Sequence, residues 1–572
     1  MAASTMMKWS SFSLNPRAPD VAETTGYKDD DGGSGSAGPV DEGFHPAAAD
    51  LQHELADHIL NVGSNLDESE QLVDVPPSEV GAEEGRWDTN NLPAKWFSWK
   101  KLWRFTGPGF LMSIAYIDPG NLEGDLQAGA NTGYILLWVL VWSTVMGGAL
   151  QLLAAKLGVA TGQHLAEHCR AEYPRAPRLL MWAMIEIAII GCDIQEVIGS
   201  AIAIFLLSKG AIPLYAGVII TAVDSFLLLL IDRIGVRHLE AMFGILVGVM
   251  AVAFGVMFAD AGVDLGQVLE GIAVPRMTRS SVHYAVAIVG AIIMPHNIYL
   301  HSALVQSRDI NRAQVARKKE AIAYFSIESS LALLISLFIN LCVVSVFAKG
   351  FYGKAAGDIG LKNAGDYLGK RFGSHMTFIW ALGLLAAGQT STMTGTYSGQ
   401  FVMGGFLNLK VSKWKRIAIT RSAAIGPTLL VALAFRNQDT KLDSLNEWIN
   451  VLQSVQLPFA LIPVLAMTSS ERIMGPEFVN HWITRAVGWL IAAGILAINA
   501  SDVYEFASNE VAGRSWVMVL LIVAVMLYFS FVLYLTIGPD RVQRWRASRS
   551  KQRQQDSRSV GSHLRAPLLT HG

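Results

Sequence analysis

Two four-residue stretches decide how this chain folds: Asp118-Pro119-Gly120-Asn121 and Met294-Pro295-His296-Asn297. Each places Pro, one further residue and Asn inside an apolar segment that is long enough to cross a membrane. Because proline removes a backbone donor and clashes with the preceding turn, a helix cannot run normally through either stretch. In lipid, freed backbone groups are tolerated only where they face protein or a water-filled cavity. We therefore expect two broken helices, a pattern typical of the binding site of a membrane transporter.

The composition divides the chain into three parts. It has 572 residues, of which 52% are hydrophobic and 16% are charged, whereas soluble domains carry about a quarter charged residues. The deficit falls on residues 97–538, which we expect to form the membrane domain. Residues 1–96 are expected to be a disordered acidic cytoplasmic tail, and residues 539–572 a disordered basic one. The first apolar run begins only after residue 100, so no cleavable signal peptide is expected.

The apolar segments predict an all-α integral membrane protein. A spanning helix needs about 20 mostly apolar residues, which gives about twelve transmembrane segments here. Segments one and six are the broken helices 1 and 6, and this five-helix offset is what an inverted 5+5 repeat predicts, with two extra C-terminal helices. The expected segments lie near residues 105–126, 133–157, 178–207, 211–231, 239–260, 283–304, 322–349, 376–400, 415–435, 446–468, 483–500 and 515–537.

The charges in the loops predict the orientation, since Lys and Arg collect on the cytoplasmic side of a membrane. Basic residues precede segment one and follow the even-numbered segments, which places both termini in the cytoplasm. The sequon at Asn499 then falls on the opposite side, close to the membrane edge. The main cytoplasmic bases are Lys100, Lys101, Arg104, Arg170, Arg175, Arg233, Arg237, Arg312, Arg317, Lys318, Lys319, Lys413, Lys415, Arg541 and Arg544.

The side chains at the breaks suggest a metal ion. A carboxylate such as Asp118 is costly in mid-membrane unless it faces a cavity or a partner. Asn121 offers a neutral oxygen, and the thioether of Met294 favours softer transition metals over Ca²⁺ or Mg²⁺. Pro295 cannot donate to the carbonyl of Ala291, which becomes free to bind a cation. The alternative interpretation makes Asp118 and Asn121 helix caps and Met294 a packing residue.

These donors carry one charge for a divalent ion, so further ligands are required. Water and possible amide donors of segment ten, Asn450 or Gln453, are expected to complete the coordination.

Other ionisable residues within the spanning segments predict a route for protons. His296 titrates near neutrality and follows the second break. Asp193 and Glu196 are three residues apart and therefore share a helix face, with Glu186 seven residues before Asp193. Intramembrane carboxylates of this kind serve proton relays, and Arg421 of segment nine is a candidate counter-charge. Alternatively His296 is structural and Arg421 snorkels to the interface; His283 and His301 are interpreted as structural.

Three runs resemble the Nramp (natural resistance-associated macrophage protein) family of proton-coupled divalent metal transporters, in its eukaryotic branch. They are Gly107–Phe110 leading into the first break, Ala291–Ser302 (AIIMPHNIYLHS), and Gly388–Phe406 (GQTSTMTGTYSGQFVMGGF). The resemblance covers roughly residues 97–538 and implies a LeuT-like inverted repeat. It implies metal ligation by Asp118, Asn121, Ala291 and Met294, with Asn450 where some members use Gln, and proton roles for His296, Asp193, Glu196 and Arg421.

The expected function is proton-coupled symport of Mn²⁺, Fe²⁺ and related ions such as Cd²⁺ into the cytosol by alternating access. The metal is the substrate, and no cofactor, nucleic acid or enzymatic activity is expected. Resemblance to eukaryotic members favours a vacuolar, lysosomal or endosomal membrane over the plasma membrane. Two rival functions stay open: a metal-sensing receptor built on a transporter body, and a Na⁺-coupled amino-acid carrier of the same fold, which Asp118 and Met294 disfavour.

Overall fold

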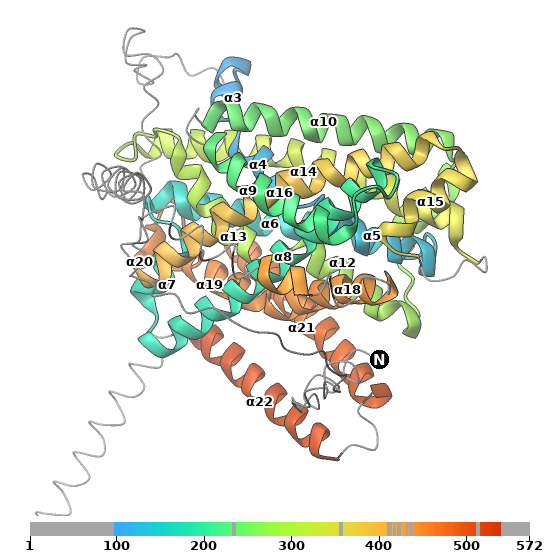
Figure 1. The fold of residues 1–572 in the computed structure, drawn as a ribbon. Coiled ribbons are helices and arrows are strands. Elements are labelled where there is room, and N and C mark those ends of the chain that lie inside the picture. Colours follow the sequence, from blue (N-terminus) through green and yellow to red (C-terminus); the bar gives the residue numbers. More distant parts are fainter. Residues whose placement is uncertain are drawn as a thin grey trace, which may run out of the picture. The chain divides into compact units, whose positions relative to one another are not determined.

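A computed structural model describes residues 97–538, except 232–235, 354–358, 511–514 and most of 409–438 (Figure 1). The two predicted tails and Arg421 lie outside the described residues, as does most of the ninth expected segment. Within the described part, every regular element is a helix.

The helices follow the expected segments closely, and several short helices join them. The spanning helices are α4 (Pro108–Ile114), α5 (Pro119–Thr132), α6 (Leu137–Thr161), α8 (Arg175–Leu207), α9 (Leu214–Ile231), α10 (Val236–Asp260), α12 (Val282–Ile292), α13 (Pro295–Leu304), α14 (Val315–Phe351), α16 (His375–Leu407), α18 (Asp439–Gln456), α19 (Pro458–Thr468), α21 (Trp482–Glu510) and α22 (Ser515–Ile537). The connecting helices are α3 (Trp99–Phe105), α7 (Leu165–Glu172), α11 (Leu265–Ala273), α15 (Leu361–Phe372) and α20 (Glu471–Met474).

Seven helical stretches of the described chain are long and apolar enough to cross a membrane. An eighth is counted if α10 and α11, which meet at a bend of 115°, form one span. The broken first segment and α16 are not among these stretches because of their composition. Helix α5 contains Glu123 and Asp125, and α16 is rich in Gly, Thr and Ser. A helix that is polar in places is expected where its neighbours are protein rather than lipid.

The two predicted breaks are present and have similar geometry. Helix α4 ends at Ile114, and α5 starts at Pro119 with Asp118 as its extended N-cap (φ −71°, ψ 170°). Helix α12 ends at Ile292, and α13 starts at Pro295 with Met294 as its extended N-cap (φ −72°, ψ 130°). Proline suits the first helical position, where its missing N–H has no helical acceptor. A third interruption, at Leu457 between α18 and α19, was not predicted.

The helix pairings repeat after a shift of five spans, as an inverted repeat requires. Helix α5 packs on α14, and α13, five spans later, packs on α6. In the same way α4 on α14 matches α12 on α6, and α10 on α16 matches α18 on α8. Two glycines permit the first of these matches, because a Cβ at Gly129 would overlap the Val344 carbonyl and one at Gly158 would overlap the Ser302 carbonyl.

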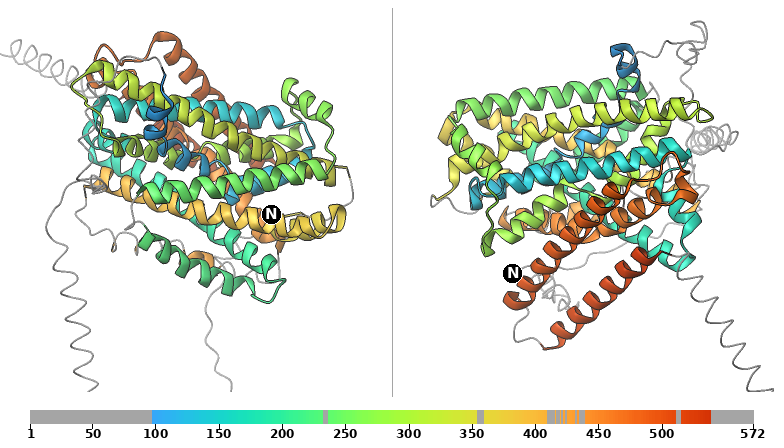
Figure 2. Two further views of the ribbon diagram at one scale, coloured as in Figure 1. Left: turned by 90° about the horizontal axis from the view of Figure 1, so that it is seen from above. Right: turned by 180° about the vertical axis from the view of Figure 1, so that it is seen from behind.

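The last two helices lie outside this repeat. Figure 1 and the right-hand view of Figure 2 show α21 and α22 at the edge of the bundle. Only 6% of the α22 span is buried, against 94% for the span that contains α12 and α13. The broken helices therefore form the centre of the protein, and α22 is placed to face lipid.

Candidate metal site

The first break holds a carboxylate and a free amide oxygen in the protein interior. Asp118 and Asn121 are 0% and 1% exposed. One oxygen of Asp118, Oδ1, accepts from the Asn121 backbone N–H at 2.7 Å and from its Nδ2 at 2.8 Å. Asn121 Nδ2 also lies 3.2 Å from the Ala115 carbonyl, so the amide oxygen points away and has no hydrogen-bond partner among the described residues. A buried acceptor without a partner is expected to receive a ligand or a water.

The second break supplies the thioether and a carbonyl. Met294 and Ala291 are each 1% exposed. The Met294 carbonyl accepts from the Asn297 N–H at 3.2 Å, which starts α13. Pro295 has no N–H for the Ala291 carbonyl, as the sequence predicts.

Helix α18 joins the two halves. A Cβ built on Gly124 of α5 would lie 3.5 Å from Asn450 Nδ2 and 3.8 Å from the Ala291 Cβ, so α5, α12 and α18 meet here. Asn450 Nδ2 donates to the Gly120 carbonyl at 2.9 Å, and its Oδ1 accepts from Gln195 Nε2 at 2.9 Å. Both ends of the Asn450 amide are thus engaged within the protein. Asn450 Oδ1 already accepts one hydrogen bond, and ligation of a metal by Asn450 stays a prediction.

Gln453 is the other amide of α18 considered for the site. It is fully buried and donates to Gln195 Oε1 at 3.2 Å. Its own Oε1 has no hydrogen-bond partner in the described structure. Among the described residues, Gln453 Oε1 therefore accepts no hydrogen bond, whereas Asn450 Oδ1 accepts one.

A cysteine connects the Asp118 carboxylate to the acidic residues of α8. Cys192 Sγ lies 3.5 Å from Asp118 Oδ2 and 3.3 Å from Glu196 Oε1. Asp193 and Glu196 both face α16, since a Cβ on Gly395 would lie 2.7 Å from Asp193 Oδ1 and 3.5 Å from Glu196 Oε1. Sequence reasoning missed Cys192, although its position one turn before Glu196 was a usable signal.

The histidines differ in their surroundings. His296 is 1% exposed, and its Nδ1 has no hydrogen-bond partner among the described residues. Both ring nitrogens of His301 are likewise buried and unpartnered. His283 instead lies between Glu447 (3.3 Å) and Asp502 (3.1 Å), where it links α12, α18 and α21.

Asn499 is buried at 4% exposure and exchanges hydrogen bonds with Ser454. The sequon asparagine is therefore inaccessible to glycosylation in this fold.

This donor set suits an exchangeable transition-metal ion better than a structural one. No group of three or more His, Cys, Asp or Glu side chains arranged to hold a metal occurs among the described residues. Structural zinc sites use such a group, with four tight ligands. Here the two helix breaks carry one carboxylate, one unpartnered amide oxygen, one carbonyl and one thioether, all of them buried. Mixed oxygen and sulfur donors favour Mn²⁺, Fe²⁺ and softer ions over Mg²⁺ and Ca²⁺.

Comparison with known proteins identifies the family of the chain. Residues 109–505 match the model of the natural resistance-associated macrophage protein-like (Nramp) family. The chain is 56% identical over 443 residues to the metal transporter Nramp3 of Arabidopsis thaliana, covering 77% of this chain and 87% of that protein. It is 53% identical over 447 residues to the metal transporter nramp1 homolog of Dictyostelium discoideum (78% and 83% covered).

Among solved structures, a mutant of the manganese transporter of Eremococcus coleocola superimposes with a TM-score of 0.70 at 30% identity. The match covers 78% of this chain and 96% of the bacterial one. The predicted all-α, multi-pass membrane fold is thereby confirmed, as is the prediction that the protein is not an enzyme. The chain belongs to the Nramp family of divalent metal transporters.

Proposed function

We propose that this protein carries Mn²⁺ and Fe²⁺, and related ions such as Cd²⁺, into the cytosol together with protons. The observation that carries the proposal is the buried pair of helix breaks, which combines a carboxylate, an unpartnered amide oxygen and a thioether. The ion binds between Asp118 and Asn121 on one side and Ala291 and Met294 on the other. The breaks let each half-helix move separately, so the site opens alternately to the lumen or exterior and to the cytosol.

The proposed direction follows from charge and orientation. With both termini cytoplasmic, Lys101, Arg317 and Glu320 form an ion cluster at the cytoplasmic end of helices α3 and α14. Each positive charge that moves inward gains about 2.3 kcal/mol per 100 mV of inside-negative potential. A co-transported proton adds the same electrical gain and that of the pH gradient, so acid on the outer side should speed uptake.

The proposed proton route runs along α8 and past His296. The Cys192 thiol lies within hydrogen-bond distance of the carboxylates of Asp118 and Glu196, can donate to either, and so connects the proposed ion site with the acidic face of α8. Asp193 and Arg421 are the further members proposed for this route. We place the protein in a vacuolar, lysosomal or endosomal membrane, which fluorescence microscopy of a C-terminally tagged protein would test.

Uptake of radiolabelled Mn²⁺ into proteoliposomes tests the proposal. Asp118→Asn should abolish uptake, while Asp366→Asn, at an exposed carboxylate on α15, should leave it unchanged. Met294→Ala should retain Mn²⁺ uptake but let Ca²⁺ and Mg²⁺ compete more strongly. Normal uptake by the Asp118 variant would refute the site. Uptake that ignores an imposed pH gradient would refute proton coupling but leave the metal site intact.

A further inference from the structure

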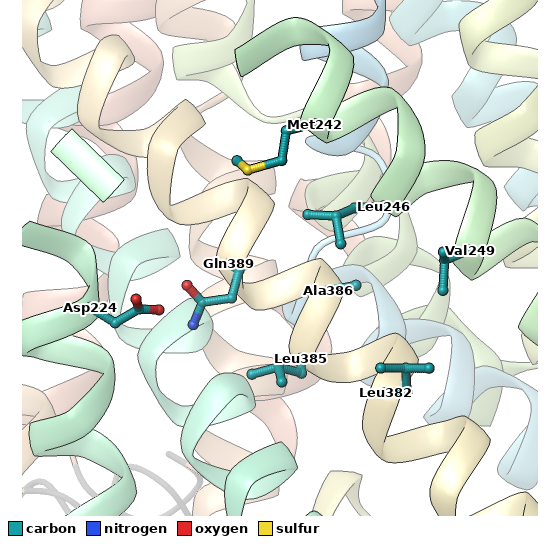
Figure 3. Close-up of a pocket in the computed structure, with 8 residues that line it drawn as sticks. All are labelled: Asp224, Met242, Leu246, Val249, Leu382, Leu385, Ala386 and Gln389. Carbon is teal, nitrogen blue, oxygen red and sulfur yellow. The ribbon is translucent and has the colours of Figure 1, made fainter. Parts of the chain in front are cut away.

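A carboxylate that is not among the proposed metal ligands lies near the middle of a spanning helix. Asp224 is the eleventh residue of α9, which starts at Leu214. At 1.5 Å per residue it lies about 15 Å along the helix, half the thickness of a hydrocarbon core of about 30 Å. Its carboxylate faces the side chain of Gln389, in the middle of α16 (Figure 3). An intramembrane acidic residue of this kind is by default a functional-site candidate.

Asp224 and Gln389 form the polar end of a cavity between α9, α10 and α16 (Figure 3). The cavity has a volume of about 270 Å³. The rest of its lining is apolar: Met242, Leu246 and Val249 come from α10, and Leu382, Leu385 and Ala386 from α16. An apolar cavity with one or two well-placed polar groups is the usual form of a small-molecule site.

The charge of the lining selects the ligand. Among the described residues that line the cavity, none is cationic, and the partner of Asp224 is a neutral amide. A carboxylate beside apolar surface is stabilised by an opposite charge. A divalent metal would require several more oxygen ligands than this lining offers. A phospholipid would place a phosphate against the carboxylate and withdraw its head group from the membrane surface.

We propose that this cavity binds a lipophilic organic amine in its protonated form. The ammonium pairs with Asp224 and Gln389, and the apolar body fills the space between α10 and α16. Such a ligand reaches the cavity from the bilayer, where neutral amines dissolve. It contacts α10 and α16 together, and α16 packs along α8, which contributes Cys192 and Glu196 to the region around the metal site. A bound amine therefore restrains the helices that must move in transport, without occupying the ion site.

Binding of a radiolabelled amine to the full-length chain in lipid nanodiscs tests the site without requiring transport. Tritiated 4-phenylbutylamine is the probe, and 4-phenylbutan-1-ol is its neutral counterpart. Loss of a charge-assisted hydrogen bond is worth about 1.5–3 kcal/mol, so Asp224→Asn should weaken amine binding roughly ten- to a hundredfold. Val249→Phe, which fills the cavity from its lipid side without changing the charge, should also weaken binding. Asp366→Asn, at an exposed carboxylate, should bind as the parent protein does.

Two results would overturn the proposal: unchanged binding in both the Asp224 and Val249 variants, or equal displacement of the probe by the alcohol. In proteoliposomes the amine should lower the maximal rate of Mn²⁺ uptake and leave its KM unchanged. Inhibition that excess Mn²⁺ removes would place the amine in the metal site and would also count against the cavity. If the parent protein carries no Mn²⁺, the proposed function fails while the binding measurement still decides this site.

Discussion

Replacement of Glu328 tests what holds α4, the first half of the first broken helix. Glu328 lies on α14 and is 1% exposed. Its Oε1 accepts from the backbone N–H groups of Gly107, Gly109 (3.0 Å) and Phe110 (3.4 Å), which begin α4. These N–H groups have no acceptor within their own helix, and the positive end of the helix dipole adds to the attraction. One buried carboxylate thus caps α4 from a neighbouring span.

Glu328→Ala leaves two buried donors, and a third that is partly buried, without an acceptor. Each such donor costs about 1–3 kcal/mol, so the variant should lose about 3 kcal/mol or more of stability. Glu328→Gln retains an oxygen acceptor and should lose roughly half as much, because only the charge is removed. The loss of stability is measured by thermal unfolding of the purified protein, with size-exclusion chromatography as the readout. Glu477→Gln is the control, since its pair with Lys319 is exposed to solvent and contributes little to stability.

The order of the variants decides the result. The loss of stability should rank Glu328→Ala above Glu328→Gln, and both above the control. If Glu328→Ala unfolds at the same temperature as the control variant, the Glu328 carboxylate does not hold α4 in place, and its role as a cap is refuted.

Three further predictions concern other parts of the chain. Cys192→Val should raise the KM for Mn²⁺ roughly two- to tenfold, in line with the loss of a hydrogen bond of about 0.5–1.5 kcal/mol. Cys192→Ser should restore the parent KM. Equal KM values for both variants would refute a role for the hydrogen bond of Cys192. Gly158→Ala should destabilise the fold by about 1–3 kcal/mol through overlap with α13, whereas Gly248→Ala, which meets no atom within 4 Å, should not lower the melting temperature. Burial lowers the pKa of His164 to about 3 and that of His168 to about 4, at the start of the connecting helix α7. Below pH 6.5 the unfolded chain therefore binds more protons than the folded one. As the pH falls below 6.5, the free energy of unfolding decreases by about 1.4 kcal/mol per pH unit for each histidine. If a variant with both histidines replaced by Asn shows the same pH dependence of its melting temperature, this explanation is refuted.

Local chemistry made the broken helices predictable, and tertiary contacts determined the rest. Pro119 and Pro295 fix the breaks because proline acts on its own turn of backbone, whatever packs around it. The shared face of Asp193 and Glu196 follows from helical spacing alone. The bonds of Asn450 to Gly120 and Gln195 depend on residues far apart in the sequence, and so escaped prediction.

The connecting segments were also beyond sequence reasoning. The 115° bend between α10 and α11 lies in a segment without proline, and the third interruption depends on Pro458, which was interpreted as part of a continuous helix. The burial of Asn499 could not be predicted from the sequence either, because its partner Ser454 lies on another span.

The position of Asp118 has a mechanical consequence. The carboxylate that would meet the ion is also the N-cap of α5, through the Asn121 N–H. An N-cap contributes about 0.5–2 kcal/mol to its helix, and a cation that draws charge from the carboxylate weakens that cap. An ion bound at Asp118 would therefore loosen the first turn of α5, so that occupation of the site and the stability of this half-helix would be coupled through one carboxylate.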